Sequence, residues 1–354
     1  MTDDTKPIRV LVAGLGNMGM SHALAYAKND GYEIAGLVNR SRVDLPDALA
    51  GLDIRPSFED ALAELQPDLC SINTYSDSHA DFAIKAMDAG AHVFVEKPLA
   101  TTVHDAERVV ACAVANGCKL VVGYILRHHP SWMRLIEEAR ALGGPYVFRM
   151  NLNQQSSGPT WETHKALMRT TSPIVDCGVH YVDVMCQITD AKPVEVRGMG
   201  LRLSDEIAED MYNYGHLQVL FDDGSVGWYE TGWGPMISET AFFVKDVMSP
   251  NGSVSIVMDP NAKSDDIDTH TKTSVIRVHR AATGADGRFA RADEDLTMEG
   301  EPGHQDLCDR EQAFVLKAIR EDMDLRRHMD DAVASLRICL AADESVRTRQ
   351  TVKL

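Results

Sequence analysis

The first 125 residues alternate between short apolar runs and longer amphipathic segments. The apolar runs are rich in β-branched residues and have the length of strands buried on both faces, whereas the segments between them carry apolar residues at helical spacing. Strands are expected at residues 8–13, 34–38, 69–72, 91–95 and 120–122, and helices at residues 21–28, 58–65, 81–89 and 103–115. This alternation predicts a parallel sheet covered by helices on both faces.

The pattern changes after residue 125, where apolar and polar residues begin to alternate over longer segments. Asp222-Asp223-Gly224 is a hairpin signal, and residues 261–303 are polar and loop-rich. Strands are expected at residues 146–153, 194–203, 213–221 and 225–233, and helices at residues 131–141, 305–320 and 330–347. We predict an α/β protein with one domain in residues 1–124 and, in residues 125–354, an α+β domain built on a large, mainly antiparallel open sheet.

The composition is that of a globular protein with two cores, since 44% of the 354 residues are hydrophobic and 25% are charged. The net charge of −18 opposes binding to a phosphate backbone, so nucleic acid is not an expected partner. Residues 1–9 lack an apolar signal core, and no apolar run reaches the ~18 residues of a membrane span. We therefore expect a cytoplasmic protein without a membrane partner. The seven cysteines show no CxxC pair and are predicted to be reduced thiols without a metal.

A glycine loop, Gly14-Leu15-Gly16-Asn17-Met18-Gly19, directly follows the first predicted strand and opens a helix. In such a unit the first glycine permits the tight turn, the second lets the backbone approach a pyrophosphate, and the third allows close packing. The helix N-terminus carries partial positive charge toward the phosphates. The expected dinucleotide contacts are Gly14, Gly16, Asn17, Met18 and Gly19. The first domain is therefore predicted to be a Rossmann dinucleotide-binding domain, and the alternative is a glycine turn without a ligand.

The residue after the second predicted strand bears on cofactor choice. NAD-preferring domains usually carry Asp or Glu there, which binds the adenosine ribose hydroxyls, but this chain has Asn39. Asparagine removes the carboxylate that repels a 2′-phosphate, and Arg40, next to Ser41, can pair with that phosphate and stack on adenine. The sequence favours NADP(H) over NAD(H), with contacts from Asn39, Arg40 and Ser41. In the alternative, Arg40 and Arg42 are solvated loop charges and Asn39 binds a ribose 2′-hydroxyl.

Two further motifs carry candidate catalytic groups. Glu96-Lys97-Pro98 ends the apolar run 91–95, which places an ammonium group at the carboxyl end of a strand beside the expected dinucleotide. In Asp176-Cys177-Gly178-Val179-His180 the acid and the imidazole are four residues apart and share one face of a helix. His180 is then able to take a hydroxyl proton while Asp176 orients it, as alcohol oxidation requires. The alternative for this pair is an ordinary helix-surface contact.

Together, the glycine loop at 14–19, Glu96-Lys97-Pro98 and Asp176-Cys177-Gly178-Val179-His180 resemble, in order and spacing, the motifs of the glucose-fructose oxidoreductase, inositol dehydrogenase and MocA (Gfo/Idh/MocA) family. The resemblance runs essentially from end to end. It implies a Rossmann domain, a mostly antiparallel α/β domain and an active site between them. It also implies hydride transfer between C4 of the nicotinamide and a hydroxyl-bearing carbon of a sugar, cyclitol or related polyol.

The resemblance assigns roles to individual residues. Lys97 bridges the cofactor and the substrate hydroxyl, Asp176 binds the substrate and orients the base, and His180 accepts or donates the proton. These roles make chemical sense, because an ammonium group stabilises a developing alkoxide and an imidazole titrates near neutral pH. If Lys97 is not catalytic, it holds only a helix end or a carboxylate. Further cofactor contacts implied by the resemblance are Thr74, Tyr75, His79, Glu96, Lys97 and Arg127.

The chain departs from the family pattern at three places. Tyr75 stands where proline is usual, and its ring either covers the bound cofactor or simply packs. His128-His129 replace a commoner aromatic-acidic pair, but adjacent histidines without a carboxylate or cysteine partner make poor metal ligands. Thr170-Thr171-Ser172-Pro173 replace a glycine-rich turn, and their hydroxyls either bind substrate or cap the following helix.

A substrate-facing wall is expected around Trp161 and the polar strand end at Asn153, because a flat ring packs on C–H faces while amides bind hydroxyls. Arg127 is expected to touch the substrate or the nicotinamide ribose. Trp228 and Trp233 lie in a strand pattern and are expected to pack in the core or at a subunit interface. The expected substrate contacts are Lys97, Arg127, Asn153, Trp161, Asp176 and His180.

We predict an NAD(P)-dependent sugar or polyol dehydrogenase that forms a homodimer or homotetramer through the open face of its C-terminal sheet. One alternative is a glycoside hydrolase or lyase that oxidises one sugar carbon transiently to labilise another bond. A second alternative is a non-catalytic NAD(P)-binding regulator. The presence of Lys97, Asp176 and His180 together argues against the regulator, because a binding protein gains nothing from a matched acid–base set.

Overall fold

The computed structural model describes residues 6–240, 242–259, 262–265 and 271–354. The chain forms two compact units. The first contains Met1–Ile125 and His304–Val333, and the second contains Leu126–Gly303 and Ala334–Leu354. The chain therefore returns to the first unit after residue 303. The sequence had predicted a single boundary, with all residues from 125 onward in the second domain.

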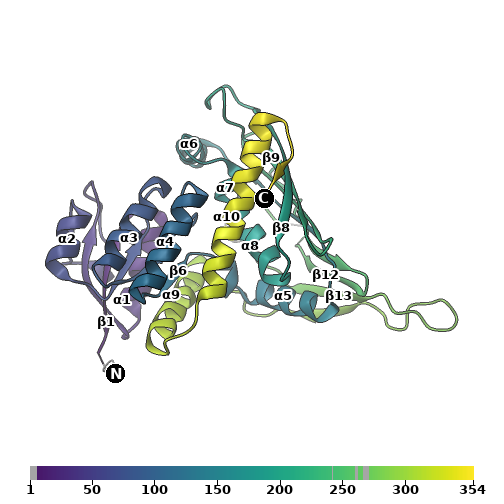
Figure 1. Cartoon of the computed structure of the whole chain (residues 1–354), viewed down its shortest axis with the longest axis horizontal. Coiled ribbons are helices and arrows are strands. Elements are labelled where there is room, and N and C mark those ends of the chain that lie inside the picture. Colours follow the sequence, from purple (N-terminus) through teal and green to yellow (C-terminus); the bar gives the residue numbers. More distant parts are fainter. Residues whose placement is uncertain (1–5, 241, 260–261, 266–270) are drawn as a thin grey trace. The chain divides into compact units, whose positions relative to one another are not determined.

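The first unit is built on a six-stranded sheet in the order β3-β2-β1-β4-β5-β6, in which all neighbours are parallel. Figure 1 labels its strands β1 and β6 and the helices α1 to α4 beside them. The order reverses between β1 and β4, so the carboxyl ends of these strands border the crevice where doubly wound sheets bind ligands. The predicted parallel sheet is confirmed. The strands are β1 (Ile8–Ala13), β2 (Tyr32–Val38), β3 (Ile54–Arg55), β4 (Leu69–Ile72), β5 (His92–Val95) and β6 (Leu120–Val122).

The core of the first unit joins its central strands to a helix from near the end of the chain. Val10 and Val12 of β1 are fully buried together with Phe94 of β5, and Val315 and Ala318 of α9 belong to the same apolar cluster. Full burial of a valine side chain stabilises a fold by roughly 1.5–3 kcal/mol. The helices of this unit are α1 (Asn17–Lys28), α2 (Phe58–Leu65), α3 (His79–Asp88), α4 (Val103–Asn116) and α9 (His304–Arg320), with short 3₁₀ turns η1 (Asp47–Leu49) and η2 (Ser76–Ser78).

The second unit is built on a nine-stranded sheet in the order β14-β13-β12-β11-β7-β10-β9-β8-β15. The central pair β7–β10 is parallel and the other pairs are antiparallel, which confirms the predicted large, mainly antiparallel sheet. The strands are β7 (Val147–Gln155), β8 (Pro193–Leu201), β9 (Tyr214–Phe221), β10 (Val226–Gly234), β11 (Lys245–Ser249), β12 (Gly252–Val257), β13 (Val275–Arg280), β14 (Glu294–Thr297) and β15 (Val352–Lys353).

Helices cover one face of this sheet, with α5 against β12 and α8 against β10. A buried lysine lies at this contact: Lys245 of β11 is only 1% exposed, and its Nζ donates to the Tyr181 hydroxyl of α8 at 2.8 Å. Burial lowers the pKa of Lys245 well below its ordinary value. The helical elements of this unit are η3 (Ile125–His128), α5 (Pro130–Leu142), α6 (Gly158–Leu167), α7 (Pro173–Asp176), α8 (Gly178–Ile188) and α10 (Arg326–Thr348), of which η3 and α10 begin in the first unit.

Six strands were not expected from the sequence: the two-residue strands β3 and β15, and the four strands β11 to β14. Residues 261–303 were predicted as loop, but they contain β13 and β14, while residue 261 and residues 266–270 of that stretch lie outside the described residues. β14 is an exposed edge strand with a single apolar core-type residue, Leu296, so it has almost no hydrophobic signal. In β11 the charged pair Lys245-Asp246 interrupts the apolar pattern although both residues are buried.

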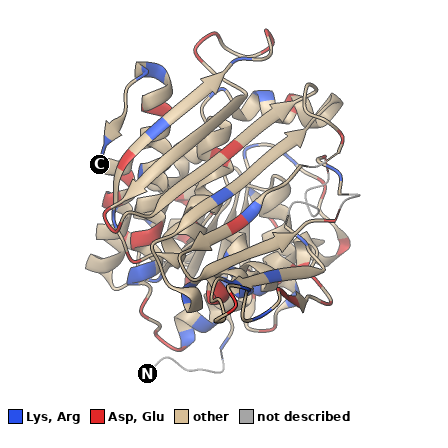
Figure 2. Ribbon diagram, turned by 90° about the vertical axis from the view of Figure 1, so that its right-hand side faces the viewer, with Lys and Arg blue, Asp and Glu red and all other residues tan. Residues whose placement is uncertain are grey.

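The other face of the nine-stranded sheet carries exposed apolar residues in a row across three strands. Val226 of β10 lies opposite Val147 of β7 and opposite Leu220 of β9, and all three are exposed. In the next row, the Arg149 guanidinium donates to both carboxylate oxygens of Asp246. Figure 2 shows this sheet with charged residues at only a few positions along its strands.

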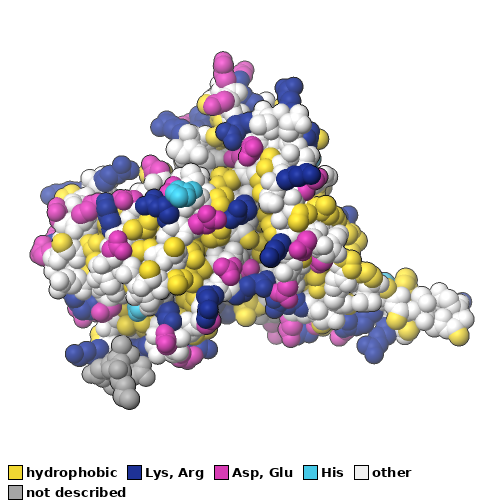
Figure 3. Space-filling model, viewed as in Figure 1, with side chains coloured by type: hydrophobic (Ala, Val, Ile, Leu, Met, Phe, Trp, Pro, Cys, Tyr) yellow, Lys and Arg dark blue, Asp and Glu magenta, His cyan; other side chains and the backbone are white. Residues whose placement is uncertain are grey.

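Acidic and basic side chains lie among one another and among apolar ones on the face seen in Figure 3. No helix in the described part of the chain is long and apolar enough to cross a membrane.

Candidate active site

The glycine loop follows β1 and has two glycines that sterics require. Gly14 has φ +85°, and a Cβ on it would lie 2.5 Å from the carbonyl oxygen of Asn73. A Cβ on Gly19 would lie 1.8 Å from the carbonyl oxygen of Gly14. Gly16 is different, because a Cβ there would meet nothing within 4 Å. Two glycines therefore close the loop onto the sheet, and the third leaves its surface open to a ligand.

Helix α1 begins directly after this open glycine. Gly16 is its N-cap and supplies no side-chain cap bond, and the first turn carries no acidic residue. The N–H groups at the start of a helix have no partner within the helix and carry partial positive charge. The residues present therefore suit a pyrophosphate at this position.

Asn39 holds the glycine loop from the end of β2. Its Oδ1 accepts a hydrogen bond from the Leu15 N–H at 3.0 Å, and its Nδ2 donates to the Ser41 carbonyl at 2.8 Å. Arg40 and Arg42 are exposed, and neither forms an ion pair with any residue that the structure describes. The carboxyl end of β2 thus presents two positive charges and an amide where an NAD-type site has a carboxylate.

The loop after β4 is fixed by a buried histidine. The ring nitrogens of His79 lie 2.8 Å from the Pro98 carbonyl oxygen and 2.9 Å from the Thr74 carbonyl oxygen, and burial lowers the pKa of His79. The ring, predicted as a cofactor contact, is engaged with the backbone on both sides. Tyr75, at the exposed tip of the loop, has 59% of its surface open, so its ring is free to approach a ligand.

Lys97 lies at the carboxyl end of β5, as predicted. The Glu96 side chain is buried and does not face solvent: its Oε1 lies 2.8 Å from Nε2 of His22, and its Oε2 accepts the Lys97 N–H at 3.1 Å. Glu96 was predicted among the cofactor contacts, and the structure shows it holding the backbone of its neighbour. Lys97 is itself partly buried.

The acid and the imidazole of the third motif lie in the second unit, on two helices rather than on the single helix predicted. α7 ends at Asp176 and α8 begins at Gly178. The turn between them, at Cys177, keeps helical dihedral angles, and the His180 N–H bonds to the Cys177 carbonyl, three residues earlier, at 3.2 Å. Asp176 and His180 are both partly buried.

Ser172 caps the helix that ends in Asp176. Its Oγ accepts the Val175 N–H at 3.1 Å and donates to Oδ1 of Asp343 at 2.8 Å. The Tyr212 hydroxyl donates to the same carboxylate oxygen, and burial raises the pKa of Asp343. Of the two roles considered for the segment Thr170-Thr171-Ser172-Pro173, capping is therefore the one that Ser172 fills.

Arg127 forms two hydrogen bonds with Asp183 of helix α8. Its Nε donates to Oδ2 of Asp183 at 2.9 Å and its Nη2 to Oδ1 at 2.5 Å, while Gln187 also donates to Oδ2 at 2.9 Å. Asp183 is fully buried. The guanidinium was expected to touch the substrate or the nicotinamide ribose, and the structure directs this edge of it to the helix that carries His180.

Helix α6 carries Trp161, which was expected in the substrate-facing wall. Trp161 is 5% exposed and its Nε1 donates to Glu206 at 3.2 Å. On the next turn of α6, His164 stacks on Trp233 with ring centroids 4.4 Å apart and planes 8° apart. Burial lowers the pKa of His164 to about 4, against the opposing effect of the Asp176 carboxylate. His164 was not singled out in the sequence, where a lone histidine in an amphipathic segment carries no signal, but its electrostatic interaction with Asp176 makes it a neighbour of the candidate site.

Asn153, expected to bind substrate hydroxyls, bonds within the sheet. Its Nδ2 donates to Oε1 of Glu230 on β10 at 2.7 Å. Gly232, opposite Asn153 in the β7–β10 register, leaves space beside this amide, since a Cβ there would lie 3.0 Å from its Oδ1. The amide therefore has one end engaged in the sheet.

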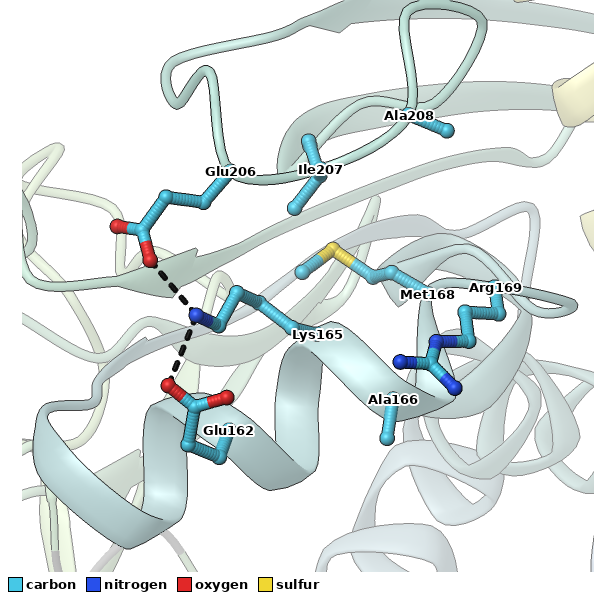
Figure 4. Close-up of a pocket in the computed structure, with 8 residues that line it drawn as sticks. All are labelled: Glu162, Lys165, Ala166, Met168, Arg169, Glu206, Ile207 and Ala208. Atoms are coloured by element: carbon cyan, nitrogen blue, oxygen red, sulfur yellow. Dashed lines mark hydrogen bonds and ion pairs between the residues drawn. The ribbon is translucent and has the colours of Figure 1, made fainter.

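A small cavity of about 240 Å³ lies against α6 and the segment 206–208 (Figure 4). Lys165 crosses it, with Nζ 2.8 Å from a Glu162 oxygen and 2.6 Å from a Glu206 oxygen. Residues predicted to be catalytic do not line this cavity. Among the described residues no group of three or more His, Cys, Asp or Glu side chains is arranged to hold a metal ion.

The strand order, the open glycine and the uncapped start of α1 define the first unit as a Rossmann-type dinucleotide-binding domain. Residues 8–124 match a family model described as an oxidoreductase family with an NAD-binding Rossmann fold, and residues 133–240 match the model of the GFO/IDH/MocA C-terminal domain. The chain belongs to the Gfo/Idh/MocA family of oxidoreductases, which confirms the resemblance found in the sequence.

Relatives and solved structures extend this comparison. The chain is 30% identical over 196 residues to the UDP-N-acetylglucosamine 3-dehydrogenase of Acidithiobacillus ferrooxidans, covering 55% of this chain and 58% of that protein. It is 27% identical over 241 residues to inositol 2-dehydrogenase 3 of Saccharopolyspora erythraea, covering 66% of each. The chain thus matches little more than half of the first of these relatives. The crystal structure of myo-inositol 2-dehydrogenase from Lactobacillus plantarum has the same fold, with a TM-score of 0.78 at 19% identity over 99% of this chain and 100% of that one.

Proposed function

We propose that this protein is an NAD(P)-dependent dehydrogenase or reductase that transfers a hydride between a nicotinamide and a hydroxyl-bearing carbon of a sugar, cyclitol or related polyol. One observation carries the proposal: the open glycine loop follows β1 and Lys97 follows β5 of the same parallel sheet. The carboxyl ends of parallel strands meet at one edge, so the ammonium group lies on the ligand-binding side of the sheet. The names of the relatives support the substrate class.

The chain's own residues are proposed to fill two roles: electrostatic stabilisation of the alkoxide and transfer of the hydroxyl proton. Bound nicotinamide supplies or accepts the hydride at C4. We assign to Lys97 the electrostatic stabilisation of the alkoxide, and to His180 the transfer of the hydroxyl proton. Asp176 orients His180 and binds the substrate. His164 stays neutral above pH about 4, and we place it with Trp161 in the wall of the polyol site.

For the cofactor, we propose NADP(H) ahead of NAD(H). Support comes from the absence of a carboxylate at Asn39 and from the two exposed arginines that follow it. Tyr75 is proposed to cover the bound cofactor with its exposed ring. Thr74 is proposed to contact the cofactor through the loop that His79 holds.

We further propose a homodimer or homotetramer formed through the open sheet face that carries Val147, Val226 and Leu220. An exposed apolar row on a large sheet is stabilised by burial against a second copy. A cytoplasmic location is proposed because none of the seven cysteines, all of them within the described residues, forms a disulfide, as is usual in reducing compartments.

The test is a panel of sugars, cyclitols and polyols with NAD⁺ and with NADP⁺, followed by the absorbance of the reduced cofactor. Lys97→Met is expected to lower kcat by about a hundredfold or more while the thermal unfolding temperature stays close to that of the wild type. Near-normal turnover of Lys97→Met would refute the assignment. Cofactor that co-purifies without net accumulation of its reduced form would instead favour a hydrolase or lyase that oxidises its substrate transiently.

A further inference from the structure

A chain of buried hydrogen bonds in the first unit ends on the backbone of Lys97. The Tyr26 hydroxyl donates to Oε1 of Gln312 at 2.7 Å, and Nε2 of Gln312 lies 2.9 Å from Nδ1 of His22. Nε2 of His22 lies 2.8 Å from Oε1 of Glu96, whose Oε2 accepts the Lys97 N–H at 3.1 Å. Tyr26, His22 and Gln312 are at most 1% exposed, and Glu96 is 6% exposed.

The direction of each bond follows from the groups at the two ends. Tyr26 is a donor, because burial raises its pKa well above the ordinary value, so the amide oxygen of Gln312 is the acceptor. The amide nitrogen of Gln312 then donates to Nδ1 of His22. The ring proton of His22 is thereby placed on Nε2, where it is donated to the carboxylate of Glu96.

A second buried acid, Glu311, lies near Glu96 in this part of the core. The neighbouring Glu311 is fully buried, and its pKa is raised well above the ordinary value, first by burial and then by the charge of Glu96. A buried carboxylate is stable only when donors reach its oxygens. His22 supplies one donor and the Lys97 N–H supplies another. The position of the Lys97 backbone therefore depends on the position of the Glu96 carboxylate.

Two further contacts hold His22 and Gln312, two members of this series of hydrogen bonds, in place. The His22 ring packs edge-on against Phe94 of β5, with centroids 4.6 Å apart. The Tyr32 hydroxyl donates to the backbone carbonyl of Gln312 at 2.7 Å. His22 is thus anchored on the strand that leads to Lys97, and Gln312 is held by its side chain and by its main chain.

We propose that Gln312 and His22 are positioning residues for Lys97. They hold the carboxylate of Glu96, and Glu96 holds the Lys97 N–H, so that the ammonium group is presented at a fixed place beside the dinucleotide loop. The proposal rests on the proposed role of Lys97 in hydride transfer. It adds that α9, more than 200 residues away in sequence, sets the geometry of the catalytic lysine.

The first experiment compares Gln312→Met with Gln305→Met. Both glutamines lie on α9 and bond to α1. Nε2 of Gln305 donates to the Ser21 carbonyl at 2.9 Å and to Oδ1 of Asp309 at 3.0 Å, whereas Nε2 of Gln312 bonds to the His22 ring, so Gln305 is a matched control. Gln312→Met is expected to lower kcat by about tenfold to a hundredfold, because a displacement near 1 Å has that effect on an oriented reaction. KM for the dinucleotide is expected to stay within about twofold, since the glycine loop is intact. Gln305→Met is expected to leave kcat within about twofold of the wild type.

The second experiment separates the donated hydrogen bond from packing. His22→Gln keeps an N–H near the position of Nε2, whereas His22→Leu removes it, so His22→Gln is expected to retain at least about fivefold more kcat than His22→Leu. Equal kcat values for these two variants, or equal effects of Gln312→Met and Gln305→Met, would overturn the proposal. Wild-type kcat in Gln312→Met together with an inactive Lys97→Met would refute the positioning role and leave the proposed function standing. An active Lys97→Met would refute both.

Discussion

Arg127 and Asp183 form an ion pair with two hydrogen bonds that joins η3 to the buried side of α8. Nε and Nη2 of the arginine donate to the two oxygens of a carboxylate that has no solvent exposure. Breaking such a pair by removing one partner leaves the other charge buried without compensation. Loss of the pair would therefore destabilise α8, the helix that carries both Asp183 and His180.

We therefore expect Arg127→Met to lower the free energy of unfolding by about 3 kcal/mol. Asp183→Asn is expected to cost less, since it removes the buried charge as well as the pair. Equilibrium unfolding in urea measures both, and the double variant Arg127→Met/Asp183→Asn should recover part of the loss seen in Arg127→Met alone. Additive losses in the double variant would contradict this account.

Substitutions at Gly16 and Gly19 are expected to have different effects: one on dinucleotide affinity and the other on stability. A Cβ on Gly19 would lie 1.8 Å from a backbone oxygen, so Gly19→Ala is expected to destabilise the protein by about 3 kcal/mol or more. Gly16 has φ −70° and open space around it, so Gly16→Ala is expected to change the unfolding temperature of the cofactor-free protein by less than about 2 °C. Its dissociation constant for the dinucleotide, measured by titration calorimetry, is expected to rise about tenfold. Unchanged affinity in Gly16→Ala would place the pyrophosphate elsewhere.

Cofactor choice is tested at the end of β2. Arg40→Ala is expected to raise KM for NADP⁺ about tenfold and to leave KM for NAD⁺ within about twofold, because only NADP⁺ carries the 2′-phosphate. Asn39→Asp retains an oxygen that accepts the Leu15 N–H but adds a negative charge, and it is expected to shift preference toward NAD⁺. Steady-state kinetics with both cofactors measure the ratio. A wild-type protein that clearly prefers NAD⁺ would contradict the NADP(H) proposal.

His164 predicts a pH dependence of stability. Burial holds the pKa of the folded histidine at about 4, whereas the unfolded chain binds this proton below about 6.5. Between these values the unfolded state binds more protons, so the free energy of unfolding falls as the pH drops from about 6.5 to about 4, by roughly 3 kcal/mol at most. His164→Phe keeps a ring on Trp233 without a titrating group, and its acid destabilisation over this window should be smaller. Parallel pH profiles for the two proteins, measured by thermal unfolding, would refute the assignment.

Local pattern was enough to predict much of the fold. The bounds of β1, α2, β4 and β6 agree with the predicted ones, because each is a short apolar or amphipathic segment between turn residues. β14 has almost no hydrophobic signal, since an edge strand buries little. The break at Cys177 is a change in hydrogen bonding from one turn to the next, which residue types do not encode.

The candidate site was predictable where chemistry is local and not where it depends on long-range contacts. The glycine loop and Lys97 follow predicted strands, so their placement at one sheet edge followed from the pattern. The partners of Glu96 and Arg127 did not follow from it. Gln312 lies 290 positions from His22, and the bond between them exists only because α9 packs on α1. Sequence motifs therefore indicated the candidate reacting groups but not the residues that hold them.

The contribution of α9 to the first unit has a consequence for how the protein is made. Val315 and Ala318 belong to the same core as the first strand, and Gln312 bonds to Tyr26 and to the ring of His22. A ribosome has to synthesise residues 126–303 of the second unit before these residues emerge. The dinucleotide-binding unit is therefore completed only after that long segment, and its unfinished apolar surface is exposed to the cell's chaperones in the meantime.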